Sequence, residues 1–223
     1  VLAILVIIAI TRMPKTQTDN AELTNVRASL SNLWHNRIYR EGVATQMFYV
    51  AAQIMTWTFI IQYADYLGID KATAQKYNIL AMTLFLSGRF ISTFLMKYIN
   101  TRRLLMLFAI GAAICSLGAI FIVGIAGLYS LVGISIFMSL MFPTIYSIAL
   151  ENVDAKDTAL GAAFLVMAIV GGALMPPLQG LIIDQQQVFG HPAVNASFVL
   201  PLLCFVIIGI YGYRTIYKLN ANR

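Results

Sequence analysis

The side chains that could do chemistry in this sequence are mainly uncharged amides and aromatic rings. Gln46, Gln53 and Trp57 are spaced seven and four residues apart, which places them on one face of a helix. Amides hydrogen-bond hydroxyl groups and rings cover apolar surface, so this face suits a neutral ligand that carries many hydroxyls. The predicted ligand-binding residues are Gln53, Trp57, Phe85, Arg89, Phe142 and Gln179.

Acid and base groups do not converge in this sequence. The acidic residues Glu41, Asp65, Glu151 and Asp184 stand at the ends of apolar runs, and both histidines lie in connecting segments. No Ser/His/Asp set and no HExxH, P-loop or GxGxxG motif is present. We therefore expect neither an enzyme nor a metal site or cofactor.

Arg89 is an ionisable residue inside an apolar run. It precedes Lys97 by eight residues, or about 12 Å of helix at ~1.5 Å per residue, so it reaches only part of the way to the membrane surface. A buried Arg normally has a partner or a cavity. We expect a role in a ligand path or a gate; the alternative is a structural Arg bonded to helix carbonyls.

The elements that must position these residues are membrane helices. The composition is 60% hydrophobic and 11% charged, whereas soluble domains are typically about 25% charged. Runs long enough to cross a bilayer core of about 30 Å predict six helices, at about 42–66, 74–96, 104–123, 128–150, 158–183 and 196–217. Residues 12–40 are predicted to be a polar linker with a short amphipathic turn near Leu30 to Trp34. Residues 1–11 are apolar but too short for a span, which predicts the remnant of an earlier membrane helix.

Positive charges are unevenly distributed about these runs. Twelve Lys and Arg residues fall on one predicted side of the membrane and two, Lys71 and Lys76, on the other. Because basic loops stay inside the cell, we predict a cytoplasmic linker and C-terminus in a multi-pass plasma-membrane protein, the inner membrane in a bacterium. The net charge of +6 then reflects topology rather than nucleic-acid binding. The twelve are Arg12, Lys15, Arg27, Arg37, Arg40, Lys97, Arg102, Arg103, Lys156, Arg214, Lys218 and Arg223.

Glycine and proline gather in the fifth run, at Gly171, Gly172, Pro176 and Pro177. Paired prolines remove backbone hydrogen bonds, so we predict a kink or an unwound turn near Pro176. Unpaired backbone groups are tolerated where they face protein or a water-filled cavity. This predicts a helix break near a transport site; the alternative is a packing kink with small residues for close helix approach.

Four segments resemble the L-fucose permeases, proton symporters in the fucose/galactose/glucose branch of the major facilitator superfamily. Gly42 to Gln53, running on to Trp57, is similar to their seventh helix, and Gly88-Arg89-Phe90 to their eighth. Met138 to Ser147 is similar to their tenth helix, and Ala168 to Pro176, with Gly180 and Asp184, to their eleventh. These segments cover most of residues 40 to 215 in the right order.

The resemblance implies an all-α membrane protein whose six helices, residues 41–223, form the C-terminal half of a twelve-helix major facilitator fold. It implies proton-coupled uptake of L-fucose by alternating access, with the N-terminal half, a sugar, a proton and the lipid bilayer as partners. The essential carboxylates of the family lie in that N-terminal half. Phe142 stands where the permease pattern has Tyr, and Gln179 resembles the glucose/galactose members. Hexose uptake is therefore the alternative, followed by a channel or a membrane sensor.

A basic cluster in the loop after the second run resembles the cytoplasmic gates of this superfamily. Lys97, Arg102 and Arg103 occupy this loop, and Glu151 ends the fourth run on the same side. We expect Glu151 to pair with Arg102, with Arg103 or with the other half of the protein. The alternative is a solvated pair that only marks topology, because an exposed ion pair is typically worth under about 1 kcal/mol.

Overall fold

The computed structural model describes residues 26–185, 187–188 and 191–221. The predicted remnant at residues 1–11 and the first part of the predicted linker lie outside these ranges. A helix, α2, covers the amphipathic turn predicted near Leu30 to Trp34. The elements are α2 Val26–His35, α3 Arg37–Tyr66, α4 Lys71–Leu95, α5 Thr101–Phe121, α6 Ile125–Met138, α7 Met141–Leu150, α8 Ala155–Met167, the 3-10 turn η1 Ala168–Val170, α9 Gly171–Ile183, β1 Gln187–Val188, β2 His191–Pro192, α10 Ala193–Ala196 and α11 Val199–Ala221.

Five of these helical segments are long and apolar enough to cross a membrane, judged by length and composition within the described residues. They are Lys71–Leu95, Thr101–Phe121, Ile125–Leu150, Ala155–Ile183 and Ala193–Tyr217. The helix α3 is 30 residues long but is not among them. Three amides, Gln46, Gln53 and Gln62, make α3 more polar than the other spans.

Three helices begin a few residues before the apolar runs that predicted them, because a polar side chain caps each one. Asn36 accepts a hydrogen bond from the backbone N–H of Tyr39 at the start of α3, at 3.2 Å. Asp70 and Asn100 accept equivalent bonds at the starts of α4 and α5, at 3.0 Å each. These caps satisfy N–H groups that have no partner within the helix, so they set where each helix begins.

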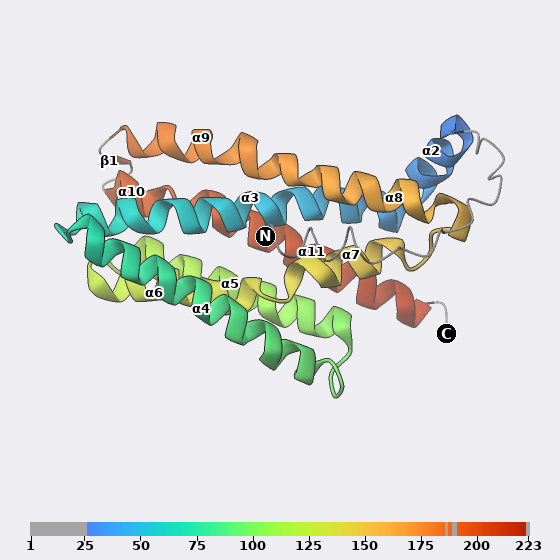
Figure 1. Ribbon diagram of the computed structural model, residues 1–223, viewed down its shortest axis with the longest axis horizontal. Helices are drawn as coiled ribbons and strands as arrows, with labels where there is room; N and C mark the ends of the chain where they lie inside the picture. Colours follow the sequence, from blue (N-terminus) through green and yellow to red (C-terminus); the bar gives the residue numbers. More distant parts are fainter. Residues whose placement is uncertain (1–25, 186, 189–190, 222–223) are drawn as a thin grey trace, which may run out of the picture.

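The helix α3 runs through the middle of the bundle (Figure 1) and packs against α4, α7, α9 and α11. On the other side α5 packs against α6 and α11, and α4 packs against α6. Large side chains such as Tyr49, Tyr63, Phe198 and Phe205 are fully buried between these helices. The spans of α4 and of α8 with α9 are only 17% and 22% buried, so these two spans lie at the edges of the bundle with wide exposed faces.

The fourth predicted span, residues 128–150, is divided into α6 and α7 at Ser139. Pro143 has no N–H to donate to the Ser139 carbonyl, and its ring crowds that carbonyl, so the helix is interrupted one turn before the proline. The Tyr49 hydroxyl of α3 donates to the carbonyl of Met138 at 3.0 Å, where α6 ends. A side chain from another helix thus satisfies a backbone group that the break exposes.

The fifth predicted span also departs from a regular α-helix, but not at the prolines. Pro176 and Pro177 lie inside α9, and the departure is the 3-10 turn η1 between α8 and α9. The helix continues through both prolines, and the predicted kink near Pro176 stays a prediction. Each proline leaves a carbonyl unpaired four residues earlier, at Gly172 and Ala173, so the loss of hydrogen bonding falls one turn upstream, close to η1.

The glycine pair at the start of α9 brings this helix close to α3. A Cβ atom on Gly171 would overlap the carbonyl oxygen of Met47, and one on Gly172 would lie 2.9 Å from Ile54. The predicted helix-break glycines therefore act as a close packing contact between two spans. Neither glycine has a positive φ, so each serves here through its missing side chain and not through backbone freedom.

Candidate functional site

A row of side chains four residues apart runs along α3: Tyr49, Gln53 and Trp57. Tyr49 is fully buried, whereas Gln53 and Trp57 are half-buried. Within the described part of the chain the side chain of Gln53 makes no hydrogen bond. Its amide, with two donor hydrogens and an acceptor oxygen, is therefore available to a ligand.

Trp57 of α3 and Phe85 and Arg89 of α4 form a continuous row of contacts between the two helices. The rings of Trp57 and Phe85 meet edge to face, with centroids 5.2 Å apart and planes at 84°. The guanidinium carbon of Arg89 lies 5.7 Å from the centroid of Phe85, within cation–π range. Arg89 is exposed, and among the described residues its guanidinium lies over this ring rather than on helix carbonyls. Trp57 Nε1 donates to the hydroxyl of Ser135 on α6 at 3.3 Å.

Phe142, the second residue of α7, is half-buried next to the other end of the row on α3. Its ring meets that of Tyr49 at 6.0 Å and 66°, again edge to face. Gln53 therefore lies, along α3, between two aromatic pairs, Tyr49 with Phe142 and Trp57 with Phe85. This arrangement offers an amide for hydroxyl groups and rings for an apolar ligand face, with the guanidinium of Arg89 beside them.

Two other glutamines that were predicted to face a ligand or to lie on the same helix face as Gln53 lie inside the bundle. Gln179 is fully buried in α9, and its Nε2 donates to the hydroxyl of Ser197 at 3.1 Å. Its Oε1 is buried without a hydrogen-bond partner among the described residues, and the ligand-binding role of Gln179 stays a prediction. Gln46 is fully buried too, and neither of its amide atoms has a hydrogen-bond partner in the described ranges. One turn before it, Gly42 packs tightly on Ala149 of α7.

Two buried polar side chains that connect helices of the bundle were not predicted from the sequence. Ser135 is fully buried and orients the indole of Trp57. No spacing in the sequence links Ser135 with Trp57, because the two residues are 78 positions apart and lie on different helices. Asn195 of α10 donates to the hydroxyl of Tyr63 at 2.8 Å and also to a carbonyl of α5 at 2.8 Å. No spacing pattern in the sequence connects Asn195 with its partners.

At the predicted cytoplasmic end, Arg102 pairs with Glu151. Arg102 is 7% exposed, and its second guanidinium nitrogen donates to the carbonyl of Thr215 at 3.0 Å. The side chain of Glu151 is half exposed. One arginine at the start of α5 thus joins the end of α7 to the last part of α11. Of the partners left open by the sequence, the structure selects Arg102 for Glu151.

The other charged residues at this end differ in their surroundings. Lys97 and Arg103 are exposed, and neither forms an ion pair within the described residues. The ammonium of Lys97 lies 5.9 Å from the centroid of an aromatic ring of α4. The carboxylate of Glu41 forms ion pairs with Arg37 of its own helix at 2.9 Å and with Arg214 of α11 at 3.0 Å. It therefore connects α3 with α11.

Comparison with known proteins identifies relatives along nearly the whole chain. A sequence model of the Major Facilitator Superfamily matches residues 1–176. The L-fucose-proton symporter of Haemophilus influenzae is 57% identical over 214 residues, which is 96% of this chain and 50% of that protein. The L-fucose-proton symporter of Escherichia coli is 35% identical over 95% of this chain and 48% of its own length. The glucose/galactose transporter of Brucella abortus is 28% identical over 93% of this chain and 49% of its own length.

Solved structures agree with these matches. The crystal structure of the E. coli fucose:proton symporter FucP superposes with a TM-score of 0.84 and 32% identity, over 96% of this chain and 52% of that one. A structure of FucP, described as a Major Facilitator Superfamily transporter in the outward conformation, gives the same TM-score at 33% identity, over 51% of its chain. The chain thus spans about half the length of the curated relatives it matches. With the sequence model, the relatives and the fold in agreement, this chain belongs to the major facilitator superfamily.

Proposed function

We propose that this chain is the C-terminal half of a proton-coupled sugar transporter and that its substrate is L-fucose. The relatives at 57% and 35% identity are both named L-fucose-proton symporters. The glucose/galactose transporter of B. abortus is more distant, at 28%. Uptake of glucose or galactose is therefore the second candidate. A channel or a membrane sensor has no comparable support among these relatives.

The observation that carries the proposal is the unpartnered amide of Gln53 between two aromatic pairs. In the complex, Gln53 hydrogen-bonds hydroxyl groups of the sugar, while Trp57 and Phe142 cover its apolar face. Arg89 adds further donors at the α4 side of the site. Phe142 supplies a ring but no hydroxyl, so this position contributes contact area without a hydrogen bond.

The proposed site works by alternating access between two six-helix halves. The face of α3 that carries Gln53 and Trp57 meets the N-terminal half, and the two halves rock to open the sugar site to one side of the membrane and then to the other. Such a site needs polar side chains that face a shared cavity rather than lipid. Half-buried, unpartnered Gln53 and exposed Arg89 are side chains of this kind.

The proton is expected to bind in the N-terminal half. The acidic residues in the described ranges lie near the ends of the spans, among them Glu41, Asp65, Glu151 and Asp184. A proton-coupling carboxylate in a symporter of this kind would be expected nearer the middle of a span, where its protonation can be linked to sugar binding. This distribution agrees with the resemblance, which places the essential carboxylates in the other half.

The cytoplasmic gate is proposed to involve Arg102 and Glu151, with Lys97 and Arg103 available to the N-terminal half. The pair between Arg102 and Glu151 holds α5, α7 and α11 together at one end of the bundle. A gate needs only a small bias, because it shifts a near-balanced equilibrium between two conformations. This assignment places the linker and the C-terminus in the cytoplasm, as the charge distribution predicts, and the protein in the plasma membrane, the inner membrane in a bacterium.

Transport by the full-length protein tests the proposal. The whole gene product is reconstituted in proteoliposomes, and uptake of labelled L-fucose, galactose and glucose is measured with and without an imposed pH gradient. We expect saturable L-fucose uptake that the gradient drives, with weaker uptake of the other two sugars. Uptake indifferent to the gradient would remove proton coupling, and faster uptake of glucose or galactose would replace L-fucose as the substrate. Flux that does not saturate would favour a channel.

A further inference from the structure

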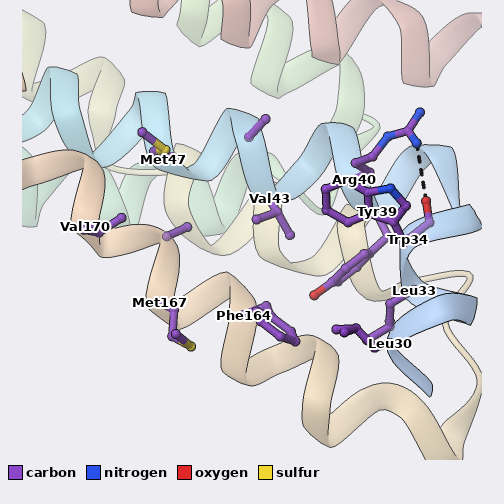
Figure 2. Close-up of a pocket in the computed structure, with 12 residues that line it drawn as sticks. Leu30, Leu33, Trp34, Tyr39, Arg40, Val43, Met47, Phe164, Met167 and Val170 are labelled. Atoms are coloured by element: carbon purple, nitrogen blue, oxygen red, sulfur yellow. Dashed lines mark hydrogen bonds between the residues drawn. The ribbon is translucent and has the colours of Figure 1, made fainter. Parts of the chain in front are cut away.

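A groove of about 430 Å³ lies between α2, the first turns of α3 and the α8–η1 segment (Figure 2). Its walls come from α2 and α3, which are consecutive in the sequence, and from the α8–η1 segment, which comes much later in the chain. They are almost wholly apolar, and Arg40 is the charged residue among those that line the groove. The apolar side chains include Leu30 and Leu33 of α2, Val43 and Met47 of α3, and Phe164 and Met167 of α8.

The charge of Arg40 is not neutralised by any described carboxylate. Its guanidinium lies 5.9 Å from the centroid of Trp34, and one of its nitrogens donates a long hydrogen bond of 3.4 Å to the Trp34 carbonyl (Figure 2). The adjacent acid, Glu41, is already engaged by Arg37 and Arg214. Most of the five N–H donors of Arg40 are therefore free to bind an anion at the edge of an apolar groove.

The groove is offset around α3 from the proposed sugar site. Val43, Met47 and Ala44 line the groove and precede Gln53 by ten, six and nine residues, which at ~100° per residue places them about 80°, 120° and 180° around the helix from it. The contact of Gly171 with Met47 fixes the α9 segment against α3 beside the groove. If the Gln53 face meets the N-terminal half, the groove opens toward the lipid rather than toward that half.

We expect the groove to lie at the depth of lipid headgroups. Arg40 stands two residues before the apolar run that begins at Gly42, at the end of the bundle that the charge distribution predicts to be cytoplasmic. Trp34 and Tyr39 line the groove at the same level, and such aromatic residues are enriched at membrane interfaces. The cytoplasmic leaflet carries anionic lipids, which basic groups at its surface attract.

We propose that this groove binds one anionic phospholipid of the cytoplasmic leaflet. One acyl chain lies between α2, α3 and α8, and the phosphate group lies on the guanidinium of Arg40. The amphipathic helix α2 is then held on the membrane surface by the lipid as well as by its own contacts. A positive charge that could bind a phosphate and an apolar groove that could hold an acyl chain occur together here. This combination distinguishes the site from ordinary lipid-facing surface.

Native mass spectrometry of the full-length transporter tests the headgroup contact. The protein is titrated with phosphatidylglycerol or with phosphatidylcholine carrying the same acyl chains, and the first bound lipid is quantified. We expect tighter binding of phosphatidylglycerol and an affinity about fivefold lower in Arg40→Gln, since one basic group near a membrane surface is worth ~1 kcal/mol. The matched control is Arg103→Gln, which removes another exposed arginine from the cytoplasmic end without touching the groove.

The variant Ala44→Phe tests the acyl-chain contact, because Ala44 is exposed and lines the groove. We expect it to weaken binding of phosphatidylglycerol while the midpoint of thermal unfolding stays at the wild-type value. Equal losses in Arg40→Gln and Arg103→Gln would reduce the effect to general charge attraction and overturn the proposal. Wild-type binding that is equal for the two lipids, or absent because the N-terminal half fills the groove, would overturn it as well. Unchanged binding in Ala44→Phe would show that the groove is not the site.

Discussion

Replacing Gln53 by Ala is expected to lower the affinity of the full-length transporter for L-fucose without lowering its thermal stability. The Gln53 amide has no hydrogen-bond partner among the described residues, so its removal leaves no protein group unpaired. What is lost is the bond to the sugar, typically ~1 kcal/mol net, which corresponds to an affinity about fivefold lower. A residue whose role was structural would change stability first and affinity second.

Equilibrium binding of L-fucose, measured by titration calorimetry on purified full-length protein, gives this change directly. Gln62→Ala is the matched control, because Gln62 is an exposed amide on the same helix, nine residues and about half a turn from Gln53. We expect wild-type affinity in Gln62→Ala. If Gln53→Ala bound L-fucose as tightly as wild type, or if both variants lost affinity equally, the site assignment would be refuted.

Phe85→Ala is expected to weaken L-fucose binding by ~1 kcal/mol, because it removes a ring of the site; wild-type affinity would make Phe85 a packing residue. Gly171→Ala should lower the free energy of unfolding by about 1–3 kcal/mol through overpacking, whereas Gly180→Ala, whose Cβ would meet nothing within 4 Å, should not. Equal thermal shifts for the two glycine variants would contradict this packing argument. Glu151→Gln removes the carboxylate that pairs with Arg102 and should shift the full-length protein toward its inward-open form while sugar still binds. Cytoplasmic cysteine labelling unchanged from wild type would count against that gate. The 223-residue chain alone should not accumulate sugar in proteoliposomes, because alternating access needs both halves, and gradient-driven accumulation by it would falsify this expectation.

The positions of the spans could be predicted from the sequence because a bilayer imposes a simple local requirement. A helix that crosses it must be apolar over about 20 residues, and this property can be read from consecutive residues alone. The caps Asn36, Asp70 and Asn100 are local signals of the same kind, and they account for the earlier starts of three helices. The family resemblance rested on short segments in the right order, and the comparisons confirm it.

The break in the fourth span was not predicted, although Pro143 was visible in the sequence. A proline shows only that one hydrogen bond is missing, and whether the helix bends or divides depends on what satisfies the exposed backbone. Here Tyr49, nearly ninety residues earlier in the chain, donates to the Met138 carbonyl. The prolines of α9 have the opposite outcome, because α9 continues through both of them and the departure from an α-helix is the 3-10 turn η1 upstream.

The sequence by itself determined which residue types were available for the site, and only the tertiary structure decided which of them are exposed to a ligand. Gln46 and Gln53 are two turns apart on one face of α3, yet Gln46 is fully buried and Gln53 is half-buried and unpartnered. Arg102 and Arg103 are neighbours in sequence, yet the first is buried against Glu151 and the second is exposed. The physical reason is that packed helices cross at an angle, so a neighbouring helix covers a given face at one level and leaves it open at another. Periodicity along a single helix carries no information about where that crossing falls.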